Sequence, residues 1–156
     1  AVASVDSLFH GDQGVHAASS GNEVWKSSPY YVADAAAKLK VDALGGELKV
    51  QLDNEEIFFV VPPGALLGEV EIEIWGYKFR TPDGTVFLYE CSPSGLTFTV
   101  PMWVNHPVTG ADLPIAGMFY NADGAWRWSL VDVAPIVNGR ALFEIDHFSK
   151  YGITYH

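Results

Sequence analysis

The tripeptide His147-Phe148-Ser149 combines residue types that can carry out self-cleavage. The Ser149 hydroxyl can attack the carbonyl carbon of Phe148, which turns the peptide bond into an ester that water then opens. This chemistry needs a distorted Phe148–Ser149 peptide bond and a nearby base, and His147 is the candidate base. The same residues also suit a structural role, with His147 and Ser149 bound to a loop through hydrogen bonds and Phe148 packed in the core.

A second group of candidate functional residues is aromatic. Trp126 and Trp128 lie two residues apart in a segment that we expect to be a strand, so their rings point to the same face. Together with Tyr120 they could form a platform on which sugar rings stack. Two tryptophans on the inner face of a sandwich are more often part of its core, and we favour that interpretation.

The acidic residues give no metal or acid–base motif. Glu69, Glu71 and Glu73 alternate with apolar residues and therefore belong to a solvent-facing side of a strand. The acidic turn Asp53, Glu55 and Glu56 lacks the ligand spacing of a calcium loop, so we expect a solvated loop.

The histidines and the cysteine give no metal-site motif either. The five histidines show no paired metal-ligand spacing; they are His10, His16, His106, His147 and His156. The single cysteine, Cys91, excludes an internal disulfide and a cysteine-based zinc site. We therefore predict no metal, no cofactor and no catalytic residue outside the tripeptide.

Composition narrows the class of protein. The chain has 156 residues, enough for one domain with a substantial core, and 49% of them are apolar. Its formal net charge of −10 argues against binding to nucleic acid or to an anionic membrane surface. The longest apolar run, residues 57–61, is too short to cross a bilayer.

Residues 1–33 differ from the rest because they show no sustained period of 2 or 3.6. We interpret them as an extended arm whose aromatic residues pack either on the chain's own sandwich or on a partner; these are Phe9, Trp25, Tyr30 and Tyr31. Residues 33–40 are compatible with one or two helical turns before the strands begin.

From Leu48 onward, short alternating segments are separated by turn signals such as Pro82-Asp83-Gly84 and Asn138-Gly139. Predicted strands cover residues 48–52, 57–61, 70–74, 86–89, 96–100, 102–104, 118–120, 126–128, 141–145 and 151–155. Many short strands with turns every eight to twelve residues predict an all-β protein, an antiparallel β-sandwich over residues 34–156.

Three segments together resemble the ZU-five domain, the β-sandwich module of ankyrins, netrin receptors and zonula occludens proteins. Residues 60–66 (Val-Val-Pro-Pro-Gly-Ala-Leu) resemble its strand followed by Pro-Gly-Ala-Leu, and residues 93–101 resemble its Pro-x-Gly-x-x-Phe-x-x-Pro strand entry. Residues 145–151 (Ile-Asp-His-Phe-Ser-Lys-Tyr) resemble its closing strand. The resemblance covers residues 45–155 and leaves the arm outside.

The resemblance implies a module for protein–protein interaction or scaffolding. Some members with death domains cleave themselves between Phe and Ser of His-Phe-Ser, and a further domain follows their cut. Here only Ser149 to His156 follow, so we expect the structural role for the tripeptide.

The leading hypothesis is a non-catalytic interaction or structural domain, an accessory subunit of an envelope or extracellular assembly that binds a protein partner or itself through the arm. The alternatives are the self-cleaving domain and the carbohydrate-binding sandwich. The opening residues Ala1-Val2-Ala3-Ser4 favour a secreted or periplasmic protein from which a signal peptide has been removed.

Overall fold

The computed structural model describes residues 25–121 and 128–155, which contain ten β-strands. Their bounds are β1 Tyr31–Val41, β2 Gly46–Leu52, β3 Glu55–Val61, β4 Val70–Thr81, β5 Gly84–Ser92, β6 Thr97–Pro107, β7 Ile115–Asn121, β8 Ser129–Pro135, β9 Arg140–His147 and β10 Lys150–Tyr155. No helix in the described residues is long and apolar enough to cross a membrane.

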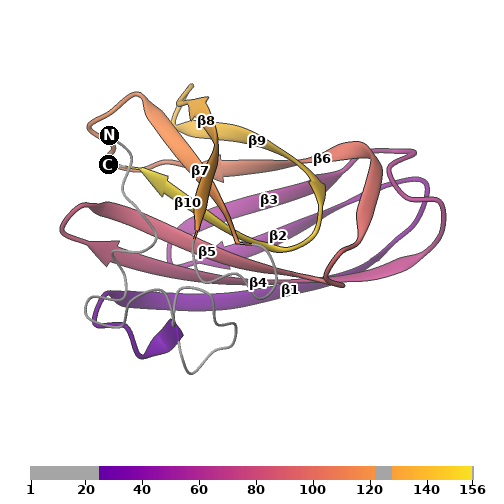
Figure 1. Ribbon diagram of the computed structural model, residues 1–156, viewed down its shortest axis with the longest axis horizontal. Helices are drawn as coiled ribbons and strands as arrows, with labels where there is room; N and C mark the ends of the chain where they lie inside the picture. The colour runs from indigo at the N-terminus through magenta and orange to yellow at the C-terminus, as the bar shows by residue number, and fades with distance from the viewer. Residues whose placement is uncertain (1–24, 122–127, 156) are drawn as a thin grey trace.

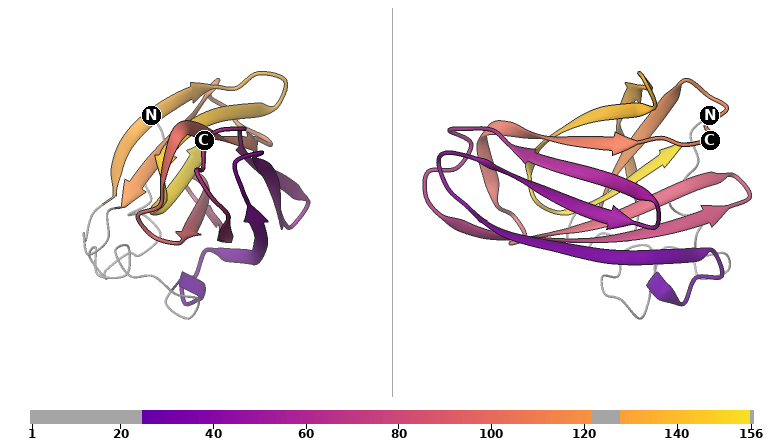
Figure 2. Two further views of the ribbon diagram at one scale, coloured as in Figure 1. Left: turned by 90° about the vertical axis from the view of Figure 1, so that its right-hand side faces the viewer. Right: turned by 180° about the vertical axis from the view of Figure 1, so that it is seen from behind.

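The strands form two stacked antiparallel sheets, as Figure 1 shows. One sheet has the order β1-β4-β5-β10-β7-β8, and the other has the order β2-β3-β6-β9. The prediction of an antiparallel β-sandwich is therefore confirmed. Strands β1 and β8 are the two edges of the larger sheet and lie at opposite borders of the molecule (Figures 1 and 2).

The suggestion of helical turns over residues 33–40 is wrong, because this segment lies inside β1. Three consecutive alanines, which have high intrinsic helix propensity, pair with β4 from Ala35↔Gly76 to Ala37↔Ile74. Burial of one side of the strand against the sandwich outweighs that local preference. The boundary proposed between residues 33 and 34 therefore falls within a strand.

The main core lies between the sheets and follows from the period of two in the strands. In β2, for example, Leu48, Val50 and Leu52 are buried while the residues between them are exposed. Phe148, in the short connection between β9 and β10, is also fully buried and meets the Phe98 ring edge-on at 5.1 Å. The connection thus contributes a large side chain to the core.

A second apolar cluster is separate from the main core and includes Trp25 from the segment before β1. Trp25 is fully buried, and its ring meets that of Tyr77 edge-on at 4.8 Å. The segment turns back through a hydrogen bond from the Ser28 amide to the Trp25 carbonyl oxygen. The other buried members of the cluster are Phe79, Val86, Leu88, Phe119 and Trp128.

Candidate functional site

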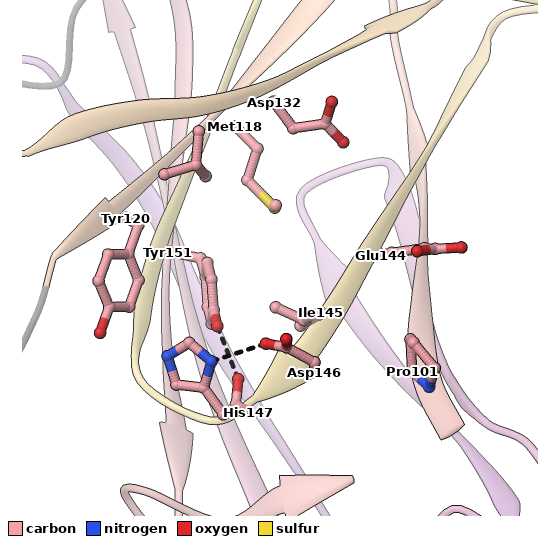
Figure 3. Close-up of a pocket in the computed structure, with 10 residues that line it drawn as sticks. Pro101, Met118, Tyr120, Asp132, Glu144, Ile145, Asp146, His147 and Tyr151 are labelled. Carbon is pink, nitrogen blue, oxygen red and sulfur yellow. Dashed lines mark hydrogen bonds and ion pairs between the residues drawn. The ribbon is translucent and has the colours of Figure 1, made fainter. Parts of the chain in front are cut away.

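The site begins with a cavity of about 350 Å³ at the border where β8 of one sheet and β9 of the other lie close together. Its lining comes from five strands, β6 to β10, so residues far apart in sequence meet there (Figure 3). The lining residues are Pro101, Met118, Tyr120, Val131, Asp132, Glu144, Ile145, Asp146, His147 and Tyr151. We call this cavity the β8–β9 cleft.

A register shift in the larger sheet accounts for one wall of the cleft. Leu130 pairs with Phe119 and Asp132 pairs with Met118, which leaves Val131 as an extra residue in β8. Such a bulge bends a strand and redirects its side chains. It explains how the consecutive residues Val131 and Asp132 both line the cleft.

Another part of the lining carries the His147 ring and two tyrosine rings beside it. The Tyr120 ring lies 5.3 Å from the His147 ring and 5.7 Å from the Tyr151 ring. The Tyr151 hydroxyl donates a hydrogen bond of 2.6 Å to the carbonyl oxygen of His147, which fixes the end of β9 against β10 (Figure 3). Burial is the largest cause that raises the pKa of Tyr151, so this hydroxyl stays protonated and acts as a donor.

The charged groups of the cleft are acidic. Asp146 binds the Nδ1 atom of His147 at 2.8 Å, and this hydrogen bond lowers the pKa of the Asp146 carboxyl. Asp132 and Glu144 add two more carboxyls, and the ten lining residues include neither lysine nor arginine. Carboxylates next to tyrosine rings form an environment that favours a cation, because both charge and ring quadrupole attract it.

The His147-Phe148-Ser149 peptide is held by several hydrogen bonds. The Phe148 amide donates to the Leu96 carbonyl oxygen at 2.7 Å, and the Phe148 carbonyl oxygen accepts from the Gly95 amide at 2.9 Å. The Ser149 hydroxyl is buried and donates to the Asn121 carbonyl oxygen at 2.9 Å. It lines a different cavity from the one that His147 lines. Phe148 thus packs in the core as the structural role requires, whereas Ser149 binds the last residue of β7 and His147 binds its neighbour Asp146 rather than a loop.

We expect Ser149→Ala to lower the free energy of unfolding by about 1 kcal/mol, because the Asn121 carbonyl oxygen loses a buried donor. Urea unfolding of parent and variant measures this change. Intact mass spectrometry of the denatured parent should show one uncut chain. A parent species that ends at Phe148, absent from the variant, would instead support self-cleavage.

The aromatic residues of the predicted arm have different positions. Trp25 is buried in the second apolar cluster, and Tyr30 and Tyr31 are partly buried against it. Tyr31 also donates a hydrogen bond to Asp34, which contributes most to raising the Tyr31 pKa to about 12. Phe9 lies outside the described residues. The described members of this set thus pack on the chain's own sandwich.

The predicted sugar platform is not assembled in the described residues. Trp128 lies just before β8 and is only 6% exposed, so its ring offers no open face for stacking. Tyr120 lines the β8–β9 cleft instead. Trp126 lies outside the described residues.

The expectation of a solvated acidic turn at residues 53–56 is wrong for Glu55, which is buried. Its side chain is only 8% exposed and forms an ion pair with Lys78, which is 5% exposed. Sequence patterning gave no indication of this pair, since Lys78 lies 23 residues further along the chain. Among the described residues no group of three or more His, Cys, Asp or Glu side chains is placed to hold a metal ion.

No protein-family model matches this chain, and no curated protein matches its sequence. The sandwich architecture that the ZU-five resemblance implied is present, and membership of that family remains a prediction.

Proposed function

We propose that the chain is a non-catalytic protein-binding domain, an accessory subunit of an extracellular or envelope assembly, and that it binds its partner at the β8–β9 cleft. The observation that carries this proposal is the exposure of β8. Leu130, Val131 and Val133 are 50%, 52% and 43% exposed, although their side chains are apolar and the strand is an edge of the larger sheet. Exposed apolar side chains beside a cavity are typical of an interaction surface.

The edge itself is poorly suited to pairing with another strand. The Asp132 carboxylate accepts a hydrogen bond of 2.8 Å from the Val133 amide, and Pro135 has no amide hydrogen to donate. Charges, prolines and bulges at an edge are the devices that prevent edge-to-edge aggregation. Binding therefore relies on side chains that enter the cleft rather than on an added strand.

Charge indicates the chemistry of the partner. The cleft carries the carboxyls of Asp132, Glu144 and Asp146, and the whole chain has a formal net charge of −10. A second copy of the chain would bring further negative charge to this surface. We therefore expect a different protein, which places a lysine or arginine side chain between the carboxylates and the rings of Tyr120 and Tyr151.

Site-specific photo-crosslinking tests this function. A photoreactive amino acid in place of Val131 should give a discrete adduct in the extracellular fraction of the producing cells. The matched control replaces Leu44, which is 82% exposed but lies between β1 and β2 on the other border. We expect the double charge reversal Asp132→Lys and Asp146→Lys to reduce the Val131 adduct at least about tenfold, because like charges then face each other. Equal labelling from both positions would contradict the proposal.

A further inference from the structure

We propose that Lys78 and Glu55 join through an amide bond between the Lys78 Nζ atom and the Glu55 Cδ atom. Lys78 belongs to β4 of the larger sheet and Glu55 to β3 of the smaller one. The bond would thus tie the two sheets together covalently across the core. This modification is independent of partner binding at the β8–β9 cleft.

The two side chains are already in contact and shielded from water. Lys78 Nζ contacts Glu55 Oε1 and lies 3.4 Å from Asp53 Oδ2. The Phe87 ring lies 5.8 Å from the same nitrogen and closes off another side. The direct contact between Nζ and Oε1 lets one proton pass from the ammonium to the carboxylate, which gives a neutral amine and a neutral acid. These are the forms that react.

The second oxygen of Glu55 has donors placed to stabilise the transition state. Glu55 Oε2 accepts hydrogen bonds from the Tyr155 hydroxyl at 3.1 Å and from the Thr109 hydroxyl at 3.4 Å. Burial raises the pKa of Tyr155, which keeps its hydroxyl protonated. Preorganised donors at the oxygen that gains negative charge lower the barrier to acyl transfer.

The step balances without a co-reactant. The Lys78 ammonium gives one proton to Glu55 Oε1, and the neutral nitrogen then attacks Cδ, which places negative charge on Oε2. Asp53 accepts a second proton from the nitrogen and passes it to the Oε1 hydroxyl. Oε1 leaves as water, the carbonyl at Oε2 reforms, and Asp53 is again a carboxylate. The net change is one ammonium and one carboxylate converted into one amide and one water.

The environments of the two carboxyls decide their roles. Glu55 is 8% exposed and holds the two hydroxyl donors, which suits the group that is attacked. Asp53 is 43% exposed, and its Oδ2 lies 3.4 Å from Lys78 Nζ, which places this carboxyl to take a proton from the nitrogen. Asp53 also has a positive φ of 57° in the turn between β2 and β3, a conformation that asparagine adopts equally well.

Intact mass spectrometry of the denatured chain tests the bond directly. We expect the mass to lie below that calculated from the sequence by one water, about 18 Da. Proteolysis should then release a branched fragment that joins the peptide containing residue 55 to the peptide containing residue 78. A parent chain with its full calculated mass would overturn the proposal.

Two controls make the result specific. Cyclisation at Asp83-Gly84 would also remove one water, so the same mass loss without the branched fragment would overturn the proposal as well. Lys78→Arg retains a cation but no amine that forms this amide, and it should show its full calculated mass. Asp53→Asn keeps the turn and removes the proton acceptor, and we expect unlinked chain to accumulate; complete linkage in this variant would overturn the role of Asp53.

Discussion

Replacing Trp25 with alanine should lower the free energy of unfolding by about 3 to 5 kcal/mol, the usual cost of removing a fully buried aromatic side chain. Trp25 has no exposed surface and packs edge-on against Tyr77 in the second apolar cluster. The substitution leaves a cavity in the second apolar cluster, between the segment before β1 and the larger sheet. Urea unfolding followed by far-ultraviolet circular dichroism measures the change, since loss of a tryptophan alters the fluorescence signal itself.

Lys26→Ala is the matched control, because it changes the neighbouring residue at the surface. The Lys26 side chain is 40% exposed, and its ion pair with Asp34 is 3.2 Å long. An exposed pair of this kind contributes at most about 1 kcal/mol. If Trp25→Ala cost no more than Lys26→Ala, the segment around Trp25 would behave as a detachable arm, as the sequence suggested, rather than as a part of the fold.

Most of the strands were predicted from the alternation of apolar and polar residues. The alternation of Leu48, Val50 and Leu52 predicts both the strand and the face that it buries, because every second side chain points to the same side. The dipeptide Asn138-Gly139 also predicts a turn, and the structure has one there. Both residues have positive φ, 51° and 74°, in the connection between β8 and β9. The local sequence was therefore enough to predict the structure of this strand and of this turn.

Predictions failed where a distant partner decided the outcome. The alanines of β1 are extended because β4 pairs with them, and β4 begins almost thirty residues after β1 ends. Pro101, expected to separate two strands, instead lies at a register shift within the single strand β6. A shift of that kind accommodates a residue without an amide hydrogen, and no local pattern indicates it.

The candidate sites were harder to predict than the strands. The β8–β9 cleft draws side chains from five strands, and the bulge at Val131 that shapes one wall depends on pairing with β7. Glu55 belongs to an acidic turn that would be solvated if Lys78 of the other sheet did not meet it. The sequence points to two of the cleft residues, and to other roles for both: His147 for a chemistry that requires contact with Ser149, and Tyr120 for a sugar platform with the tryptophans.

We also expect the protein to lose stability steeply as the pH falls below 6.5, because His106 must charge on unfolding. Burial lowers the pKa of His106 to about 3, and the nearby cation of Arg140 acts in the same direction. Nδ1 donates to the Pro107 carbonyl oxygen at 2.9 Å, so Nε2 accepts from the Tyr89 hydroxyl at 2.6 Å. The folded state therefore holds a neutral ring in one tautomer.

The direction of the effect follows from proton binding. Between pH 6.5 and about 3 the unfolded chain binds a proton at His106 that the folded chain does not, so stability falls as the pH falls. The slope from this group is about 1.4 kcal/mol per pH unit, which amounts to about 2 to 3 kcal/mol between pH 6.5 and 4.5. Urea unfolding at a series of pH values measures it.

His106→Gln isolates this contribution from that of the carboxyls. The variant should be less stable than the parent at pH 7, because it fills the site less well and replaces the bond to Tyr89 imperfectly. Its stability should depend less on pH, so the difference from the parent should shrink as the pH falls toward 4.5. A difference that stays constant over this range would mean that His106 takes up its proton in the folded state as readily as in the unfolded one, and that burial does not hold it neutral.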